Sequence, residues 1–204
     1  MGRFFWPKGL IKDVTWIEVG LKLLDWTLAG IDRSLIKNIV LICHSTQYET
    51  LSRHLDKLRI LPCENSEITG LMMDVFSQSS GDILFIYPWV VFHKEFCQQF
   101  MSIADSDVLL ASNDFGLLNP DESYRHQVTM EKMQLHGEQV ITCGRLLDKE
   151  NWHAAFSGMA RIDQSAIQIM LSIWNKLRSD PPEFFHDSIN LEKIRFTDFI
   201  NQMI

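Results

Sequence analysis

Short apolar runs alternate with helix-patterned segments over the first half of the chain, and this alternation constrains the fold more than any other feature. The apolar runs are NIVLICH, RILPC, ILFIY and DVLLAS, at residues 38–44, 59–63, 83–87 and 107–112. Segments with helical spacing of apolar residues lie around them, at 16–30, 46–58, 66–78 and 94–103. Strands joined by helices of ten or more residues are typical of βα units. The pattern predicts an α/β fold with a mostly parallel sheet flanked by helices on both faces.

The pattern changes after Asn113. Two alternating segments within residues 127–147 flank His136-Gly137-Glu138 and predict a late β-hairpin. A further strand is predicted at 153–163, followed by helices at 164–177 and 190–204. The sequence shows no repeat, low-complexity tract or Gly/Ser linker, so we expect a single domain over residues 1–204.

Composition limits the classes of partner. The chain has 19 Lys and Arg residues against 26 Asp and Glu, a net charge of −7. Nucleic acids and anionic membranes bind basic surfaces, so we expect neither as a partner. The longest apolar runs have the length of strands and do not reach that of a membrane span. The cysteines form no C-x-x-C pair, and we expect reduced thiols, no metal and a cytoplasmic location; they are Cys43, Cys63, Cys97 and Cys143.

The stretch GDILFIYPWVVFHKEF, residues 81–96, raises the main functional question. In α/β proteins ligands bind at the carboxyl ends of the strands. Sites of that kind usually carry Gly, Asp, Glu, Ser or Asn, but here Pro88 and Trp89 follow the predicted strand. An indole offers one N–H donor and no metal ligand.

Four segments carry a family resemblance: WIEVGLKLLDWTLAGIDRSLIKNIVLICH, NSEITGLMMDVFSQSSGDILFI, MQLHGEQVITCGRLL and FSGMARIDQSAIQIM. Together with the order of the elements over residues 7–204, they resemble nucleotidyltransferases of the glycosyltransferase-A type fold. The sugar-phosphate nucleotidyltransferases and the phosphocholine or phosphonate cytidylyltransferases are the most similar groups. The resemblance implies a nucleotide cleft, and it leads to these ligand-cleft candidates: Lys8, Lys22, Asn65, Thr69, Gly70, Trp89, Gly158 and Asp163.

The chain departs from the family at the residues that carry its chemistry. Family members open with a loop L-A-A-G-x-G-x-R, whose backbone N–H groups hold the nucleotide phosphates. This chain opens with MGRFFWPKGL, in which only Pro7-Lys8 matches. The family's metal-binding Gly-Asp is replaced by Pro88-Trp89, and its later W-x-E-I-D-T strand has no counterpart up to Ile204. Losing these groups removes several kcal/mol of transition-state stabilisation.

We therefore expect a catalytically degenerate nucleotidyltransferase-like protein that binds a ligand or regulates a partner, with Trp89 filling the old site. No catalytic residue and no cofactor is assigned, and the partners we expect are a nucleotide ligand and a homo- or hetero-oligomer. The alternative is an active cytidylyl- or uridylyltransferase acting on a phosphorylated small molecule. It would need magnesium in a rebuilt site with contributions from Lys8, Lys22 and Asp163.

A third alternative is a glycosyltransferase that uses Asp105 and Asp107. These residues form a D-x-D motif with Ser106, but the motif precedes a predicted strand rather than following one. We favour a turn at this place. His44, His153 and the aromatic pair Phe184-Phe185 are weaker candidates for a cleft or a partner surface.

The family's first strand also has no clear counterpart. It is central in the sheet, and the local candidate for its place is the segment at residues 3–6, directly before Pro7-Lys8. Its aromatic residues have high β-propensity. We expect it to pair within the sheet, with any shortfall met by a second chain.

Overall fold

The computed structural model describes residues 16–55, 58–64, 68–88, 90–103, 106–113, 131–147, 152–188 and 191–204. The helices are α1 (Trp16–Gly30), α2 (Ser45–His54), α3 (Ile68–Ser77), α4 (Lys94–Ser102), α6 (Gln164–Ser179) and α7 (Phe196–Met203), with a 3-10 turn at Leu191–Lys193. The strands are β1 (Val40–His44), β2 (Arg59–Cys63), β3 (Ile83–Ile86), β4 (Val108–Asn113), β5 (Lys132–His136), β6 (Gln139–Gly144) and β7 (Ala154–Ile162). The predicted mixture of helices and strands is confirmed.

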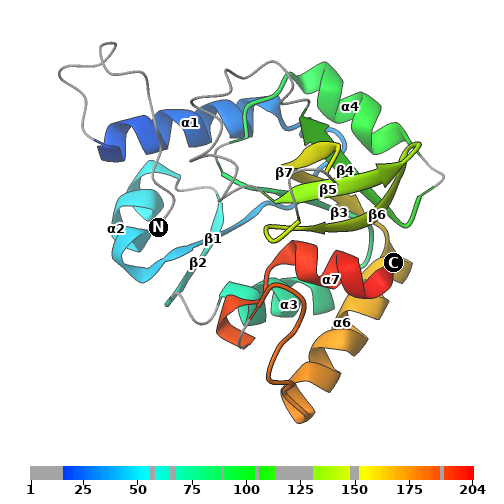
Figure 1. The fold of residues 1–204 in the computed structure, drawn as a ribbon. Helices are drawn as coiled ribbons and strands as arrows, with labels where there is room; N and C mark the ends of the chain where they lie inside the picture. Colours follow the sequence, from blue (N-terminus) through cyan, green and yellow to red (C-terminus); the bar gives the residue numbers. More distant parts are fainter. Residues whose placement is uncertain are drawn as a thin grey trace.

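Strand β7 organises the larger of two sheets (Figure 1). β3 and β4 both pair with it in antiparallel fashion, and Ile83 and Val108 are both opposite Ile162. β3 and β4 therefore run parallel to each other on the two sides of β7. The beginning of β7 pairs with β5, which forms a hairpin with β6. β1 and β2 make a separate two-stranded parallel sheet.

The prediction of a mostly parallel sheet is not confirmed. Among the described strands β1 and β2 pair in parallel, whereas every pairing in the larger sheet is antiparallel. The alternating pattern indicates that strands and helices follow one another, but it does not indicate the spatial order of the strands. β7 arrives after the hairpin and lies between β3 and β4. The hairpin itself, with its turn at Gly137-Glu138, is where the sequence predicts it.

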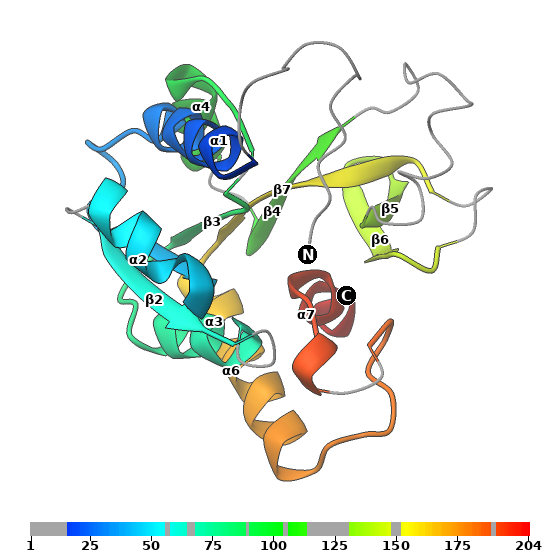
Figure 2. The ribbon, with the colours of Figure 1, turned by 90° about the vertical axis from the view of Figure 1, so that its left-hand side faces the viewer.

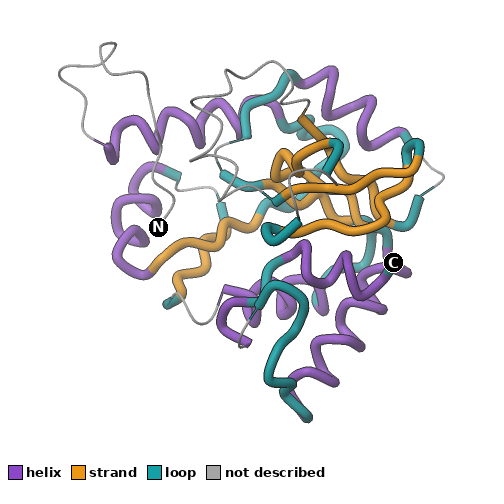
Figure 3. Tube along the Cα trace, viewed as in Figure 1, coloured by secondary structure: helices purple, strands orange, loops and turns teal. Residues whose placement is uncertain are grey.

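Helices cover both faces of the larger sheet. α1 and α4 lie on one side, and α3, α6 and α7 lie on the other, in two views at right angles (Figures 1 and 2). The strands of the larger sheet consequently lie between these two helix layers (Figure 3). The most deeply buried apolar side chains come from β7 and β5 and from α3, α6 and α7; they include Met73, Met133, Met159, Ile162, Ile167, Met170 and Phe199. The main core therefore lies between the sheet and the second helix layer.

Strands β1 and β3 are less buried than their apolar sequences predict. Residues 40–42 and 83–86 are only half-buried. In the described part of the chain β1 pairs with β2 alone and β3 with β7 alone. A half-exposed apolar strand with an open edge can accept a further strand. The segment at residues 3–6 that we expect there lies outside the described residues, so its pairing stays a prediction.

The four cysteines are buried and form no disulfide. Burial raises the pKa of Cys143 to about 12, and a thiol that stays protonated is a poor nucleophile and metal ligand. None of the helices in the described ranges has both the length and the apolar character that crossing a membrane requires.

Candidate functional site

The end of β3 is occupied by an aromatic ring. The chain leaves β3 through Tyr87 and Pro88, which we call the β3 exit. The Tyr87 N–H donates to the Gly158 carbonyl at 2.7 Å. Gly158 has a φ of +88°, and a Cβ added to it would lie 2.4 Å from Cδ2 of the Tyr87 ring. The ring thus packs directly on the backbone of β7, where no larger residue than glycine fits.

The exit is also tied to the first helix. Pro88 is half-buried, and its carbonyl accepts a hydrogen bond from Oγ1 of the buried Thr27 at 3.1 Å. Thr27 lies on α1, which belongs to the helix layer opposite α7 (Figure 1). Trp89, which we expect to fill the site, lies outside the described residues. Tyr87 is therefore the side chain that occupies the described part of the exit.

A buried carboxyl group faces the Tyr87 hydroxyl. Glu131, 7% exposed, accepts hydrogen bonds from the Tyr87 hydroxyl at 3.1 Å and from the Thr197 hydroxyl at 3.2 Å. Burial raises the pKa of Glu131, and burial together with the Glu131 charge raises the pKa of Tyr87. Tyr87 therefore remains a protonated donor at neutral pH, and burial makes the charged form of Glu131 less favourable than it is in water.

Two arginines complete this group. Arg145 follows β6 and Arg195 precedes α7, and both side chains are half-buried. Neither guanidinium forms an ion pair with another described residue, and Nε of Arg145 is buried without a hydrogen-bond partner. Burial and the positive charge of Arg195 lower the pKa of Arg145. We call Tyr87, Glu131, Arg145, Arg195 and Thr197 the polar centre.

Two of the candidates predicted from the sequence lie at the polar centre. Gly158 supports the Tyr87 ring directly. The hydroxyl of Thr69, buried on α3, donates to the Ile194 carbonyl at 2.8 Å, next to Arg195. Gly70 follows on α3, and a Cβ added to it would lie 3.8 Å from the ring of Trp174. Three further candidates lie outside the described residues: Lys8, Asn65 and Trp89.

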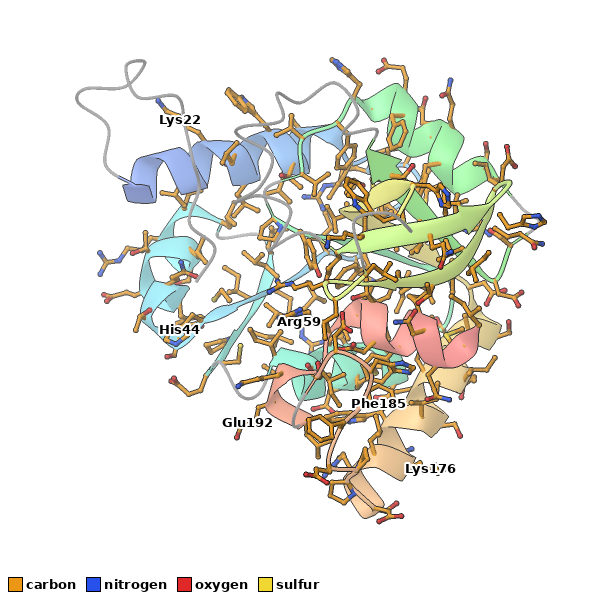
Figure 4. The ribbon with its side chains drawn as sticks, in the orientation of Figure 1. Lys22, His44, Arg59, Lys176, Phe185 and Glu192 are labelled. Carbon is orange, nitrogen blue, oxygen red and sulfur yellow. The ribbon has the colours of Figure 1, made fainter. Side chains whose placement is uncertain are left out.

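The remaining two candidates lie elsewhere. Asp163 follows the carboxyl end of β7, five residues beyond Gly158, which is roughly 16 Å of extended chain. It is the N-cap of α6 and accepts a hydrogen bond from the Ala166 N–H at 2.8 Å, which lowers its pKa. Lys22 is exposed on the side of α1 that points away from the sheet (Figure 4).

The D-x-D motif lies at the same edge as Asp163. The Asp163 N–H donates to the Asp107 carbonyl at 2.9 Å, and Asp107 precedes β4. Because β3 and β4 are parallel, Asp107 is at the end opposite the β3 exit. Asp105 lies outside the described residues. The geometry agrees with the expectation that this motif sits at the amino end of its strand.

The other weak candidates have structural contacts. His44 ends β1 (Figure 4) and is the N-cap of α2. Its Nε2 lies 3.5 Å from Oε2 of Glu64. His153 accepts a hydrogen bond from the Leu135 N–H at 3.0 Å and so supports the hairpin. Phe185 is buried, whereas Phe184 is 63% exposed. Within the described part of the chain, no three His, Cys, Asp or Glu side chains are arranged to hold a metal ion.

Sequence reasoning missed most of the polar centre. Glu131 and Arg145 lie within residues 127–147, where the hairpin is predicted, and Tyr87 ends the predicted strand, but none of them belongs to a motif. The hydrogen bonds that Glu131 accepts from Tyr87 and Thr197 join residues 44 and 66 positions apart. Only the clustering of charged residues at the two ends of an otherwise alternating hairpin could have drawn attention to Glu131 and Arg145.

Comparison with known proteins places the fold. No protein-family model and no curated protein matches the sequence. Among solved structures, the inositol-1-phosphate CTP transferase from T. maritima matches with a TM-score of 0.55 at 10% identity, over 74% of this chain and 61% of that chain. A protein assigned as a glucose-1-phosphate thymidylyltransferase, from Bacillus anthracis, matches with a TM-score of 0.58 at 10% identity, over 88% of this chain and 69% of that chain.

A third structure has nearly the same length. The 4-diphosphocytidyl-2C-methyl-D-erythritol synthase from Anaerococcus prevotii matches with a TM-score of 0.50 at 12% identity, over 91% of this chain and 88% of that chain. The chain thus spans about three fifths of the first neighbour and most of the third. The resemblance to nucleotidyltransferases is confirmed at the level of the fold, which is nucleotidyltransferase-like.

Proposed function

We propose that this nucleotidyltransferase-like chain binds a ligand or regulates a partner and does not transfer nucleotides. One observation carries the proposal: the Tyr87 ring lies on Gly158 and hydrogen bonds to Glu131 at the end of β3. By the resemblance, this is the strand end at which family members place Gly-Asp and their metal ion. In this chain Pro88 and Trp89 take the place of that Gly-Asp, and neither they nor the adjacent protonated phenol of Tyr87 supply a carboxylate ligand.

Loss of the metal-binding carboxylate should greatly lower the rate of nucleotidyl transfer. Nucleotidyl transfer depends on metal ions and cations that neutralise the phosphates, with little covalent work for the protein. Glu131 is a described acid that contacts the Tyr87 hydroxyl, but it is buried and its oxygens already accept two hydroxyl hydrogen bonds. Removing one preorganised electrostatic group typically lowers a rate by a factor of about 10² to 10³. We propose no cofactor for this chain.

The direct test is a measurement of pyrophosphate. The whole chain is incubated with magnesium and CTP, UTP or dTTP, together with phosphocholine, a phosphonate, inositol 1-phosphate or glucose 1-phosphate. We expect no magnesium-dependent pyrophosphate above a blank without protein. Sustained release with any pair of substrates would overturn the proposal and favour an active transferase.

An active nucleotidyltransferase is the second candidate, because two of the three structures named above are described as a CTP transferase and a thymidylyltransferase. It needs a metal site rebuilt from residues such as Lys8, Lys22 and Asp163. Of the two that are described, Lys22 points away from the sheet (Figure 4) and Asp163 caps a helix. A glycosyltransferase that uses Asp105 and Asp107 ranks third, because Asp107 precedes its strand.

The setting and the partners belong to the same proposal. Four buried free thiols suit a reducing, cytoplasmic environment. The exposed Phe184 supports an oligomer or a partner protein, because aromatic residues are enriched at interfaces. A nucleotide remains one of the ligands to test.

A further inference from the structure

One edge of the larger sheet is bonded to a side chain of α7. β6 is the last strand of that sheet and pairs with β5 alone in the described part of the chain. α7 packs against β6 (Figure 1). We propose that Asn201, on α7, seals this edge and so prevents β6 from pairing with a second copy of the chain. The inference concerns assembly and does not depend on the proposed function.

The Asn201 amide bonds to both backbone groups of Cys143, near the end of β6. Its Oδ1 accepts the Cys143 N–H at 2.7 Å, and its Nδ2 donates to the Cys143 carbonyl. The N–H and the carbonyl of a strand residue point to the same side, so this side of Cys143 faces away from β5. A residue of a further antiparallel strand would make the same two bonds. The side chain thus takes the place of a neighbouring strand.

Two more hydrogen bonds hold α7 at this place. The Cys143 thiol donates to the Thr197 carbonyl at 3.3 Å, and the Thr142 hydroxyl donates to Oδ1 of Asn201 at 3.2 Å. Thr197 and Asn201 are four residues apart and therefore lie on the same face of α7. Because that face is turned toward β6, the amide is held in position against the strand.

Burial makes the Asn201 contact necessary. Cys143 is 1% exposed, so water has little access to take the place of the amide, and an unpaired buried N–H or carbonyl is costly. The first half of β6 is protected differently, because a register shift opposite Gln134 and Leu135 leaves Ile141 without a partner on β5. A bulge of this kind disfavours pairing along an edge. Without Asn201, the end of β6 would be open to another strand.

The partner that we infer for an unsealed edge is a second copy of this chain. In a solution of the purified protein, the matching edge is the β6 strand of another molecule. Two such strands can pair about a two-fold axis and form a closed dimer. Pairing would give both backbone groups of Cys143 a partner again. Loss of the Asn201 amide should therefore produce affinity between copies as well as a local defect.

The test compares Asn201→Ala with the wild type by analytical ultracentrifugation over a dilution series and by hydrogen exchange of the Cys143 amide. We expect the mass of the variant to rise toward twice that of the wild type as concentration increases, with the wild-type mass as the reference. At the lowest concentration its Cys143 amide should exchange at least about tenfold faster, because the N–H has lost its acceptor. Gln202→Ala is the matched control, since Gln202 is the next residue of α7 and is exposed, and it should change neither quantity.

Three further variants separate pairing from a loss of stability. Asp163→Ala removes the N-cap of α6 and should keep the wild-type mass despite its lower stability. Adding Ile141→Lys to Asn201→Ala places a charge at an exposed position of the edge and should return the mass to the wild-type value. Asn201→Asp keeps the acceptor for the Cys143 N–H and loses the donor to its carbonyl, so it should associate less strongly than Asn201→Ala. If Asn201→Ala does not fold, Asn201→Asp takes its place in the mass measurement.

The outcomes that would overturn the inference are distinct. One is an Asn201 variant whose mass does not rise above that of the wild type at any concentration. Another is association that Ile141→Lys does not reverse, because the copies would then pair elsewhere. In the wild type itself, a Cys143 amide that exchanges as fast as an exposed amide would show that Asn201 does not seal the edge.

Discussion

The two ends of β7 use buried arginines in opposite ways. At the carboxyl end of β7, Arg161 is 4% exposed, and its guanidinium donates to the carbonyls of Ile103 and Ser106, the latter at 3.0 Å. At the β3 exit, neither Arg145 nor Arg195 donates to a carbonyl in the described part of the chain, and the nearby Asp187 and Asp198 accept backbone N–H groups. Nε is buried without a hydrogen-bond partner in both Arg161 and Arg145, so the two ends differ in the carbonyl bonds of Arg161 and not in a buried, unpaired Nε.

The comparison distinguishes a buried arginine that bonds to the backbone from two half-buried arginines that do not. Arg161 fixes the connection between α4 and β4, and the neighbouring Asp163 caps α6. Changes in Arg161 should therefore lower stability more than changes in Arg145 or Arg195.

The largest effect is expected at Gly158. Gly158→Ala places a Cβ at a φ of +88°, 2.4 Å from the Tyr87 ring, so backbone strain and a steric clash add to about 4 kcal/mol of lost stability. Urea unfolding followed by circular dichroism measures it. Gly137→Ala is the matched control: its φ is +62° but nothing lies within 4 Å, so it should cost only about 1 kcal/mol. Equal losses at both glycines would show that the Tyr87 ring does not occupy the exit.

Arg161→Gln should have the next largest effect. It removes hydrogen bonds from a buried cation to two carbonyls, and we expect a loss of about 2–3 kcal/mol in the free energy of unfolding. The exposed Arg178→Gln should stay within about 0.5 kcal/mol of the wild type. A stable Arg161→Gln protein would remove the structural half of the comparison.

Asp163→Ala tests the assignment of this residue to a helix cap. Because the carboxylate accepts the Ala166 N–H at 2.8 Å, its loss should cost about 1 kcal/mol. Urea unfolding measures the loss, and an unchanged free energy of unfolding would contradict the assignment to a helix cap.

The smallest effect is a pH dependence from Glu131. Burial raises its pKa above the ordinary value of 4.5, so over the interval between the two values the unfolded chain has released a proton that the folded chain still holds. The free energy of unfolding therefore falls as pH rises through that interval. Glu131→Gln keeps a group that can bond both hydroxyls and should flatten the slope in urea melts at a series of pH values. An unchanged slope would mean that Glu131 titrates normally.

The succession of elements could be predicted from the sequence because it follows from local periodicity. The hairpin at Gly137-Glu138 and the helix that ends at Gly30 are examples. The order of strands could not be predicted, because β7 reaches its place between β3 and β4 through pairings that no local pattern encodes.

The site was only partly predictable for the same reason. The resemblance indicated Gly158 and Thr69. Gly158 acts through its positive φ and its missing side chain, and Thr69 acts through a hydrogen bond made from its position on α3. The polar centre depends on Thr197, Glu131 and Tyr87 meeting from three separate elements. A charged residue at the end of a hairpin looks the same in sequence whether its partner is solvent, backbone or ligand.

The most direct test measures the stability of Arg161→Gln and Arg195→Gln side by side by urea unfolding. Arg161→Gln should lose about 2–3 kcal/mol in the free energy of unfolding, because it removes hydrogen bonds from a buried cation. Arg195→Gln should stay within about 0.5 kcal/mol of the wild type. If both variants lose the same stability, the two ends do not differ as we infer.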